Sequence, residues 1–171
     1  MSGACLIRPL TAADAAAVLA LHKAAAATPG GLARMPDEVT PAYVQAFLAK
    51  AAADGVVLGG WSEDGALLGE IHATRMSPAL FAHVLGDLTV AVHPDGQGHG
   101  VGTALFGALI TAARRMTPPI GRVELMTGSG NLGAIRLYER LGFRHEGRLI
   151  GRGRLSDGRV EDDIAMALML L

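Results

Sequence analysis

Residues 90–102 form the most informative stretch of the chain, Val-Ala-Val-His-Pro-Asp-Gly-Gln-Gly-His-Gly-Val-Gly. Three β-prone residues lead into four glycines within seven residues, and the apolar run Val101 to Ala113 follows directly. This pattern predicts a strand, a glycine-rich loop and a helix in immediate succession. Glycines let backbone amides approach a ligand, and a helix start leaves N–H groups unpaired, so the segment is suited to a pyrophosphate. A tight strand-to-helix turn that needs glycine only for its shape is the alternative.

Two nucleotide-binding motifs do not match this loop. A phosphate-binding loop of the Gly-Lys-Ser/Thr type needs a lysine, and the chain has none after Lys50. A dinucleotide-binding fingerprint that starts at Gly98 and Gly100 needs a third glycine where the chain has Thr103. The loop therefore does not indicate an ATP or NAD site by either motif.

The elements around the loop predict one α/β domain over residues 1–171 with a mixed sheet. Helices are expected at Thr11 to Ala27, Thr40 to Ala53, Val101 to Met116 and Asn131 to Arg140. Strands are expected at Leu6 to Arg8, Val56 to Ser62, Ala66 to Arg75, His83 to Val92, Val123 to Thr127, Phe143 to Leu155 and Arg159 to Leu170. The predicted order is β-α-α-β-β-β-α-β-α-β-β.

Composition excludes several classes of protein. The chain has 171 residues, 50% of them hydrophobic and 18% charged, which is a globular composition and not a disordered one. The single cysteine, Cys5, excludes a disulfide framework, and the six histidines show no metal-ligand spacing, so no metal is expected. The longest apolar run is shorter than the roughly 20 residues of a membrane span. We find no signal peptide and expect a cytoplasmic protein.

Charge is distributed unevenly along the chain. The formal net charge of −1 gives no support for a nucleic-acid partner. Up to residue 113 there are five basic and nine acidic residues, whereas from Arg114 onward there are ten arginines and seven acidic residues. This arginine-rich part is either a solvated basic face or a region for an anionic ligand.

Two motifs together resemble the GNAT superfamily of acyl-CoA-dependent N-acyltransferases. The loop matches the signature Gln/Arg-x-x-Gly-x-Gly/Ala as Gln97, Gly100 and Gly102. Downstream, Asn131-x-x-Ala-Ile-x-Leu-Tyr138-x-x-Leu-Gly142-Phe143 is similar to the asparagine–tyrosine helix of that family. The resemblance covers nearly the whole chain. It implies a mostly antiparallel sheet with helices on both faces, splayed between the strand before the loop and the strand after the following helix.

The resemblance also implies acetyl-CoA as co-substrate and assigns its contacts. Backbone groups of the strand before the loop would hold the pantetheine, and amides of the loop and helix start would hold the pyrophosphate. The residues implied in cofactor binding are Val90, Ala91, Val92, Gln97, Gly98, His99, Gly100, Val101, Gly102, Thr103, Asn131 and Tyr138. Tyr138 occupies the position of the general acid that protonates the leaving thiolate, unless it is a core tyrosine. Asn131 either helps to hold the pantetheine or caps its helix.

The general base is less well defined, because the family has no universal one. We predict Asp87 as the acidic group near the acceptor amine, since a carboxylate among apolar residues is costly without a purpose or partner. A salt bridge within the sheet would also explain it. Glu70 and His72 become the better candidates if Asp87 points into the helix layer, and His83 is a further one.

The acceptor is expected to be a small-molecule primary amine that attacks the thioester directly in a ternary complex. Residues 28–37 and 75–83 should frame its cleft, and Arg34 and Arg75 there would suit an amine that carries a carboxylate. The alternatives are a protein N-terminus or lysine as acceptor, a non-catalytic CoA-binding or interaction module, and a nucleotide-binding protein.

The carboxyl-terminal strand suggests a homodimer. Its end, Ile164 to Leu171, is an unbroken apolar run, and one covered face would leave side chains on the other face exposed. A two-fold contact would cover them.

Overall fold

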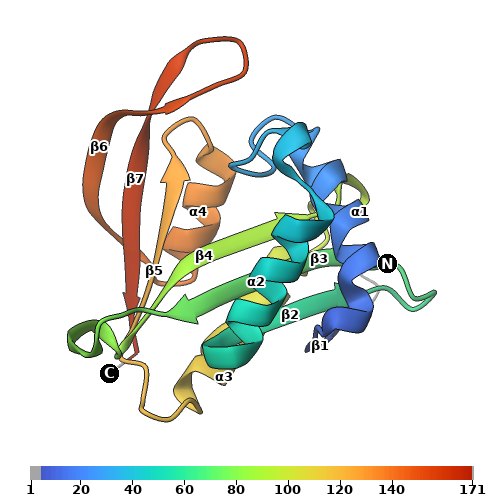
Figure 1. Cartoon of the computed structure of the whole chain (residues 1–171). Coiled ribbons are helices and arrows are strands. Elements are labelled where there is room, and N and C mark those ends of the chain that lie inside the picture. Colours follow the sequence, from blue (N-terminus) through green and yellow to red (C-terminus); the bar gives the residue numbers. More distant parts are fainter. Residues whose placement is uncertain (1–4, 171) are drawn as a thin grey trace.

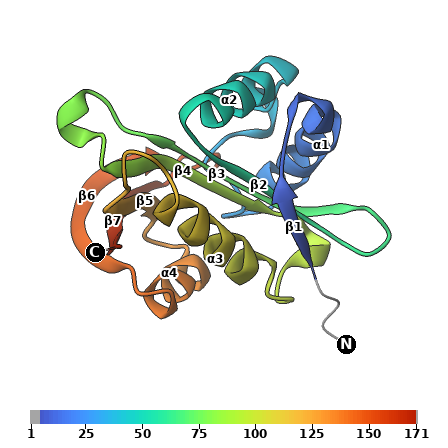
Figure 2. The ribbon, with the colours of Figure 1, turned by 90° about the horizontal axis from the view of Figure 1, so that it is seen from below.

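The computed structural model describes residues 5–170, which form one seven-stranded sheet with two helices on each face (Figures 1 and 2). The strands are β1 (Leu6–Pro9), β2 (Gly55–Trp61), β3 (Leu67–Arg75), β4 (Val84–Val92), β5 (Arg122–Gly128), β6 (Arg144–Arg154) and β7 (Val160–Met169). The helices are α1 (Ala15–Ala26), α2 (Pro41–Asp54), α3 (Val101–Arg114) and α4 (Leu132–Arg140). The order of these elements confirms the prediction from the sequence.

The sheet order is β1-β2-β3-β4-β5-β7-β6, and β4–β5 is its parallel pair. The other neighbouring strands run antiparallel. This arrangement confirms the mixed, mostly antiparallel sheet. The turn at Asp64-Gly65 joins β2 to β3 as expected, with Gly65 at φ +85°, a conformation that glycine adopts readily.

Two apolar layers hold the helices to the sheet. On one face, α3 buries Leu105, Phe106 and Leu109 against β2, β3 and β4. On the other face, α2 buries Val44, Phe47 and Leu48 against β2 and α1. Figure 2 shows α1 and α2 together above the sheet, with α3 and α4 below it.

The helix starts follow the capping signals of the sequence. Thr11 and Asp14 form a capping box, in which the Thr11 N–H donates to Asp14 Oδ2 at 2.9 Å. The chain first makes the short 3₁₀ turn Ala12–Asp14, so the α-helix begins later than predicted, at Ala15. Thr40 caps α2 by accepting from the Tyr43 N–H at 3.2 Å, with Pro41 in the first helical position.

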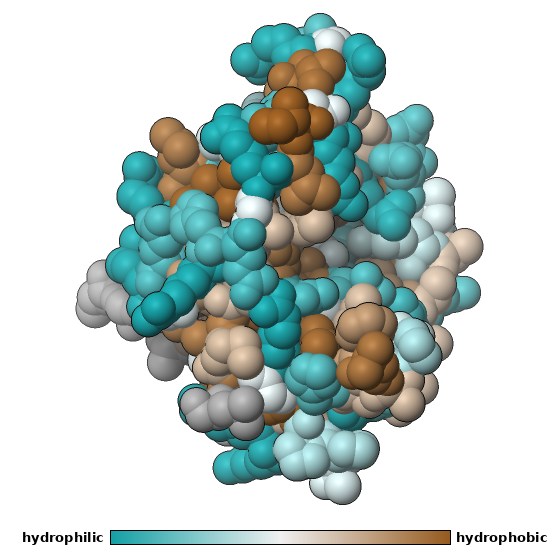
Figure 3. All heavy atoms as spheres, turned by 90° about the vertical axis from the view of Figure 1, so that its left-hand side faces the viewer, coloured by the Kyte–Doolittle hydropathy of each residue, from teal (hydrophilic) through white to brown (hydrophobic). Residues whose placement is uncertain are grey.

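The carboxyl-terminal hairpin differs in part from the expectation. Strand β7 lies between β5 and β6, so its apolar residues Ile164, Met166 and Ala167 are buried within the molecule, and Leu171 lies outside the described residues. Met169 of the same run is 55% exposed, as the expectation requires, and Met126, Ile150 and Val160 of β5, β6 and β7 are exposed as well. Figure 3 faces the side on which β6 forms the sheet edge and shows apolar surface (brown) among hydrophilic side chains (teal).

No helix within residues 5–170 combines the length and the apolar character that a membrane crossing requires.

Candidate active site

Strands β4 and β5 separate soon after they meet. They pair only at Val84–Arg122 and Leu85–Val123, whereas β4 continues alongside β3 as far as Val92. Figure 1 shows the two strands diverging from their common end, with α4 beyond the opening. From Gly86 onward, β4 has no paired strand on its β5 side among the described residues. Its peptide groups there are free to bind an extended ligand, and the predicted splay is confirmed.

A β-bulge lies in β4 at the start of this opening. His72 pairs with Thr89 and Thr74 pairs with Gly86, so two residues of β4, Asp87 and Leu88, oppose Ala73 alone. Asp87 has φ +49°, which is uncommon for a residue other than glycine. Such bulges bend a strand and redirect its side chains, and they are frequent beside active sites.

The glycine-rich loop presents unpaired amides at the start of α3. Gly98 and Gly100 have φ of +75° and +80°, and Gly100 is the N-cap of α3. The first helical hydrogen bond runs from the Ala104 N–H to the Gly100 carbonyl at 3.0 Å, so the preceding amides have no partner within the helix. The Gln97 N–H is occupied, because it donates to the Pro94 carbonyl at 3.2 Å. The amide set that can face an anion therefore begins at Gly98.

Close packing joins α3 to α4 behind the loop. A Cβ atom on Gly102 would lie 3.4 Å from Leu137 Cδ2, whereas one on Gly98 or Gly100 would meet no atom within 4 Å. Backbone conformation thus favours glycine at Gly98 and Gly100, whereas a Cβ on Gly102 would only touch the end of the Leu137 side chain.

Tyr138 is buried behind the opening. Its ring packs edge-on against Phe106 at 5.3 Å between centroids and also contacts Phe143. Burial raises the pKa of Tyr138 to about 12, so the hydroxyl keeps its proton at neutral pH. The hydroxyl forms no hydrogen bond with residues 5–170, yet it is not among their fully enclosed unpaired polar atoms. It is therefore an accessible proton donor.

Asn131 caps α4 and also holds a loop. Its Oδ1 accepts from the Ala134 N–H at 3.3 Å, which realises the capping role considered from the sequence. Its Nδ2 donates to the Gly30 carbonyl at 3.0 Å. This contact joins the loop after α1 to the end of the opening.

A cavity of about 320 Å³ lies between that loop, α2 and β4, and its lining residues are Leu32, Ala33, Arg34, Glu38, Tyr43 and Thr89. The Arg34 guanidinium carbon lies 4.0 Å from the centre of the Tyr43 ring. Arg34 takes part in none of the ion pairs found within residues 5–170. The lining carboxylate, Glu38, accepts from the Met35 N–H at 2.8 Å. The cavity thus contains a positive charge without a carboxylate partner.

Glu70 and His72 lie on the α1–α2 face of β3, together with a histidine that the sequence did not single out. The His22 Nε2 and Glu70 Oε2 atoms lie 2.8 Å apart, as do His72 Nδ1 and Glu70 Oε1. The side chains of His22 and Glu70 are fully buried, and that of His72 is 8% exposed. Burial would raise the pKa of the Glu70 carboxyl, but the two imidazoles together outweigh burial and hold it below its ordinary value.

The structure places Asp87 away from this cluster. Its side chain is 60% exposed, and Oδ2 lies 2.8 Å from Lys50 Nζ of α2. Asp87 therefore has an ion-pair partner, as the alternative to a catalytic role required, but this partner lies on a helix and not within the sheet, and the Asp87 charge faces solvent beside the helix layer. The apolar neighbours of Asp87 in the sequence do not enclose it, because the bulge turns its side chain outward.

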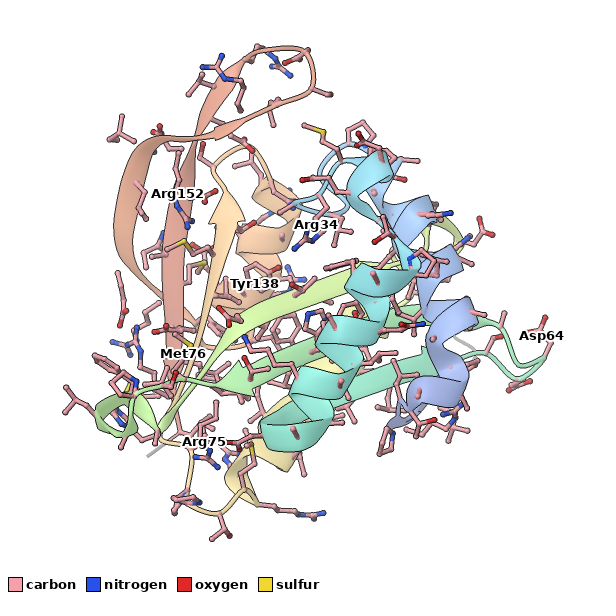
Figure 4. The ribbon with its side chains drawn as sticks, in the orientation of Figure 1. Arg34, Asp64, Arg75, Met76, Tyr138 and Arg152 are labelled. Carbon is pink, nitrogen blue, oxygen red and sulfur yellow. The ribbon has the colours of Figure 1, made fainter. Side chains whose placement is uncertain are left out.

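Arg75 and His83 are not brought to the cavity. Arg75 Nε donates to Asp54 Oδ1 at 2.9 Å, and its guanidinium also contacts the Ala82 carbonyl. Figure 4 shows Arg75 at the lower end of the molecule, whereas Arg34 lies in its upper half. His83 is exposed just before the start of β4. The cleft is therefore bounded by the first predicted loop, and residues 75–83 pack elsewhere.

Local sequence patterns point only weakly to His22, Tyr43, Phe47 and Thr89 as residues of the site. His22 shares the buried face of α1 with Val18, Leu21 and Ala25, at the spacing of a core position. A histidine on such a face signals a buried polar partner, but its partner lies 48 residues away. Within residues 5–170, no three His, Cys, Asp or Glu side chains are arranged to hold a metal ion.

Comparison with known proteins agrees with this architecture. The profile of the acetyltransferase (GNAT) family matches residues 21–143. The chain belongs to the GNAT acetyltransferase family. Its GNAT fold is shared with ribosomal-protein-alanine N-acetyltransferase from Brucella melitensis, which is 28% identical, with a TM-score of 0.84 and coverage of 96% of this chain and 99% of that one.

Two further relatives of this GNAT chain are informative. The protein yncA from Salmonella typhimurium, solved with acetyl-CoA, is 27% identical with a TM-score of 0.83, and the match covers 98% of this chain and 95% of that one. An uncharacterized N-acetyltransferase from Methanocaldococcus jannaschii is 44% identical over 57 residues, which are 33% of this chain. The match spans only 24% of the length of that curated relative.

Proposed function

We propose that the protein transfers the acetyl group of acetyl-CoA to the primary amine of a small molecule that also carries an anionic group. The observation that carries this proposal is the opening between β4 and β5, together with the unpaired amides at the start of α3 and the protonated Tyr138 of α4. An extended pantetheine along residues 90–92 and a pyrophosphate on the amides of 98–103 would fill this opening. The acetyl-CoA found with yncA supports the assignment.

The reaction is a direct attack of the amine nitrogen on the thioester carbonyl. The C–N bond forms, the C–S bond breaks, and the departing thiolate takes the proton of the Tyr138 hydroxyl. Tyr138 can take this role because its hydroxyl is protonated at neutral pH and so has a proton to donate as the sulfur becomes basic. The two substrates are held in adjoining sites, which supplies the orientation that a direct transfer needs.

Arg34 supports an acceptor that bears a carboxylate or a similar anionic group. A guanidinium without a carboxylate partner, stacked on an aromatic ring, binds such a group through two parallel hydrogen bonds. The cavity of about 320 Å³ is in the range of small-molecule sites. A protein N-terminus is the second candidate acceptor, because the 28% identical Brucella melitensis protein is named as a ribosomal-protein-alanine N-acetyltransferase.

The proposed acceptor class is tested by pairs of amines that differ only in the carboxylate. Release of CoA from acetyl-CoA is measured with amino acids, with their carboxamides, with the decarboxylated amines, with polyamines and with alanine-terminated peptides. We expect the amino acids to be preferred, and Arg34→Gln to remove about 10- to 100-fold of their kcat/KM, the value of a charge-assisted hydrogen bond.

The matched control is Arg115→Gln, which removes one exposed arginine outside the cavity and should leave the preference unchanged. Preference for the peptides would favour the protein N-terminus instead. CoA binding without transfer to any amine would favour a non-catalytic CoA-binding module. Failure to bind CoA would overturn the proposal altogether.

We also propose that the protein works in the cytoplasm as a homodimer. The single cysteine suits a reducing compartment. Strand β6 is a sheet edge that carries the exposed side chain of Ile150, and pairing with a second copy would cover both.

A further inference from the structure

We propose that His72 is the general base of the acetyl transfer, and that Glu70 and His22 are positioning residues that hold its ring in the proton-accepting form. This inference rests on the proposed function and deepens it, since it assigns the group that prepares the amine. It is carried by the geometry of three buried side chains from α1 and β3.

The Glu70 carboxylate is held from both sides. One oxygen faces His22 Nε2 and the other faces His72 Nδ1, each at 2.8 Å. Phe47 of α2 stacks on the His72 ring with centroids 4.0 Å apart and planes 9° apart, and it also stacks on His22 at 5.1 Å. Hydrogen bonds and ring contacts therefore fix both the position and the tilt of the His72 ring.

The buried polar atoms indicate where the ring protons lie. His22 Nδ1 is enclosed and has no hydrogen-bond partner among residues 5–170. An N–H there would be buried without an acceptor, which is costly, so we assign Nδ1 a lone pair and Nε2 the proton. His22 is then a neutral donor, and the negative charge of Glu70 is left to act on His72.

His72 presents its other nitrogen outward. Since Nδ1 donates to Glu70, Nε2 carries the lone pair. Nε2 forms no hydrogen bond within the described residues, and it is not among their enclosed unpaired atoms. His72 pairs across the sheet with Thr89, and Thr89 lines the cavity that contains Arg34. His72 itself does not line that cavity, but it lies directly across the sheet from a residue that does, so we infer that the lone pair faces the proposed acceptor site.

Charged and titratable groups surround the cluster from each neighbouring element. His22 comes from α1, Tyr43 lies on α2 with its ring 5.8 Å from His22, and Arg34 from the loop stands over Tyr43. Asp87 of β4 forms an ion pair with Lys50 at the surface. Glu70 is the carboxylate hydrogen-bonded to the His72 ring, so its charge stabilises the imidazolium that forms when His72 takes a proton.

The proton balance requires one base and one acid. The acceptor ammonium gives a proton to His72 Nε2 and becomes a nucleophilic amine. Attack forms the C–N bond and breaks the C–S bond, and the nitrogen loses its second proton as the amide forms. The Tyr138 hydroxyl gives its proton to the departing thiolate, and the second proton of the nitrogen, passed through water, restores that hydroxyl. The first proton returns to solvent from His72, so one thiol and one released proton balance the ammonium that entered.

The first test separates the two nitrogens of His72. The amide of His72→Asn can still donate to Glu70 from the place of Nδ1, but the variant has no Nε2. We expect kcat/KM for the amine to fall by about 10²- to 10⁴-fold while acetyl-CoA binding is unchanged. The defect should shrink with acceptors of low amine pKa and at higher pH, because those amines arrive already deprotonated.

The second test concerns His22. His22→Leu removes the donor to Glu70, whereas His22→Gln supplies an N–H near the former Nε2. We expect His22→Leu to lower kcat and to change the acid limb of the kcat/KM profile against pH. His22→Gln should restore most of that loss, which a merely space-filling role of His22 would not explain.

The closing experiment reads the protons without catalysis. Two-bond ¹H–¹⁵N correlation spectra of the wild type, with ¹⁵N-labelled histidine, should show His22 protonated at Nε2 alone and His72, at high pH, at Nδ1 alone. The opposite tautomer of His72, or His72→Asn activity within about threefold of wild type at every pH, would overturn the inference. Wild-type protein that acetylates no amine would instead contradict the proposed function and leave the tautomers to be read independently.

Discussion

Tyr138 is one of two tyrosines in the chain, so the effect of removing its hydroxyl can be compared with the effect of removing the hydroxyl of Tyr43. Tyr138→Phe keeps the ring packed against Phe106 and removes only the hydroxyl. We expect kcat to fall by about 10²- to 10⁴-fold with little change in acetyl-CoA affinity, because only the proton for the leaving thiolate is lost. Initial rates and calorimetric titration measure the two quantities.

The control for this prediction is Tyr43→Phe, which keeps the ring under Arg34. It should change KM for the acceptor more than kcat. A Tyr138→Phe effect confined to KM for acetyl-CoA would make Tyr138 a packing residue.

Asp87, in contrast to Tyr138, is not expected to take part in catalysis. Its carboxylate is exposed and paired with Lys50, and surface ion pairs contribute little to stability. Asp87→Asn should therefore keep kcat/KM for amines within about threefold of wild type. A selective loss of amine kinetics, with normal acetyl-CoA binding, would restore Asp87 as the group nearest the acceptor.

Asn131 links two elements through a single side chain. Asn131→Asp keeps an oxygen to cap α4 but removes the N–H that donates to Gly30. We expect the melting temperature of Asn131→Asp to match that of wild type. Its KM for the acceptor should rise, because the loop that carries Arg34 loses its hydrogen bond to α4. Asn131→Ala should also lose about 1 kcal/mol of unfolding free energy, measured by denaturant titration. Unchanged KM in both variants would contradict a role for this anchor.

The role of the start of α3 in acetyl-CoA binding is tested by adding a negative charge next to its unpaired amides. Gly100→Glu places a carboxylate at the helix start and forces a residue with a side chain into φ +80°. Acetyl-CoA binding should be lost. Gly107→Glu adds the same charge at a point of α3 where a Cβ meets no atom within 4 Å, so it should bind normally. Binding by a folded Gly100→Glu protein would remove the loop from the site.

Glu70 of β3 forms a hydrogen bond with His22 of α1, and the pKa of its carboxyl is lowered. The direction of this pKa shift determines how the stability of the fold changes with pH. The pKa of a glutamate carboxyl is about 4.3 in the unfolded chain. Because the pKa of Glu70 is lower in the folded protein, its carboxylate stabilises the fold fully at pH values above the unfolded pKa. This stabilisation is lost as the pH falls through the folded pKa. The melting temperature of wild type should thus fall more steeply below about pH 4 than that of Glu70→Gln. Parallel melting curves against pH would contradict the coupling.

The secondary structure was largely predictable, because periodicity and capping act over a few residues. Thr40-Pro41 marks the start of α2, and the glycines mark the turn into α3. The placement of side chains across the sheet was not predictable in the same way. Simple alternation along β4 does not reveal the bulge at Asp87, and the His22–Glu70 contact joins residues 48 positions apart. Both depend on register between elements that the local sequence does not specify.

Strands β1 and β6 are the two edges of the sheet, and the proposed dimer is tested at β6. Ile150 is 79% exposed, so Ile150→Asp should leave the monomer fold intact. We expect wild type to sediment as a dimer at micromolar concentration and Ile150→Asp to shift toward the monomer. Leu80→Asp, at a residue that is 76% exposed in the turn before β4, is the control and should remain dimeric. A wild-type monomer would contradict the proposal.

The opening, the glycine loop and Tyr138 together support one activity, the transfer of an acetyl group to an amine. The most direct measurement is mass spectrometry of the products when acetyl-CoA and the amine panel are incubated with wild type and with Tyr138→Phe. We expect one N-acetylated amine per CoA released by wild type, and a rate lower by about 10²- to 10⁴-fold for the variant. CoA release without an acetylated amine, or equal rates for the two proteins, would contradict the account.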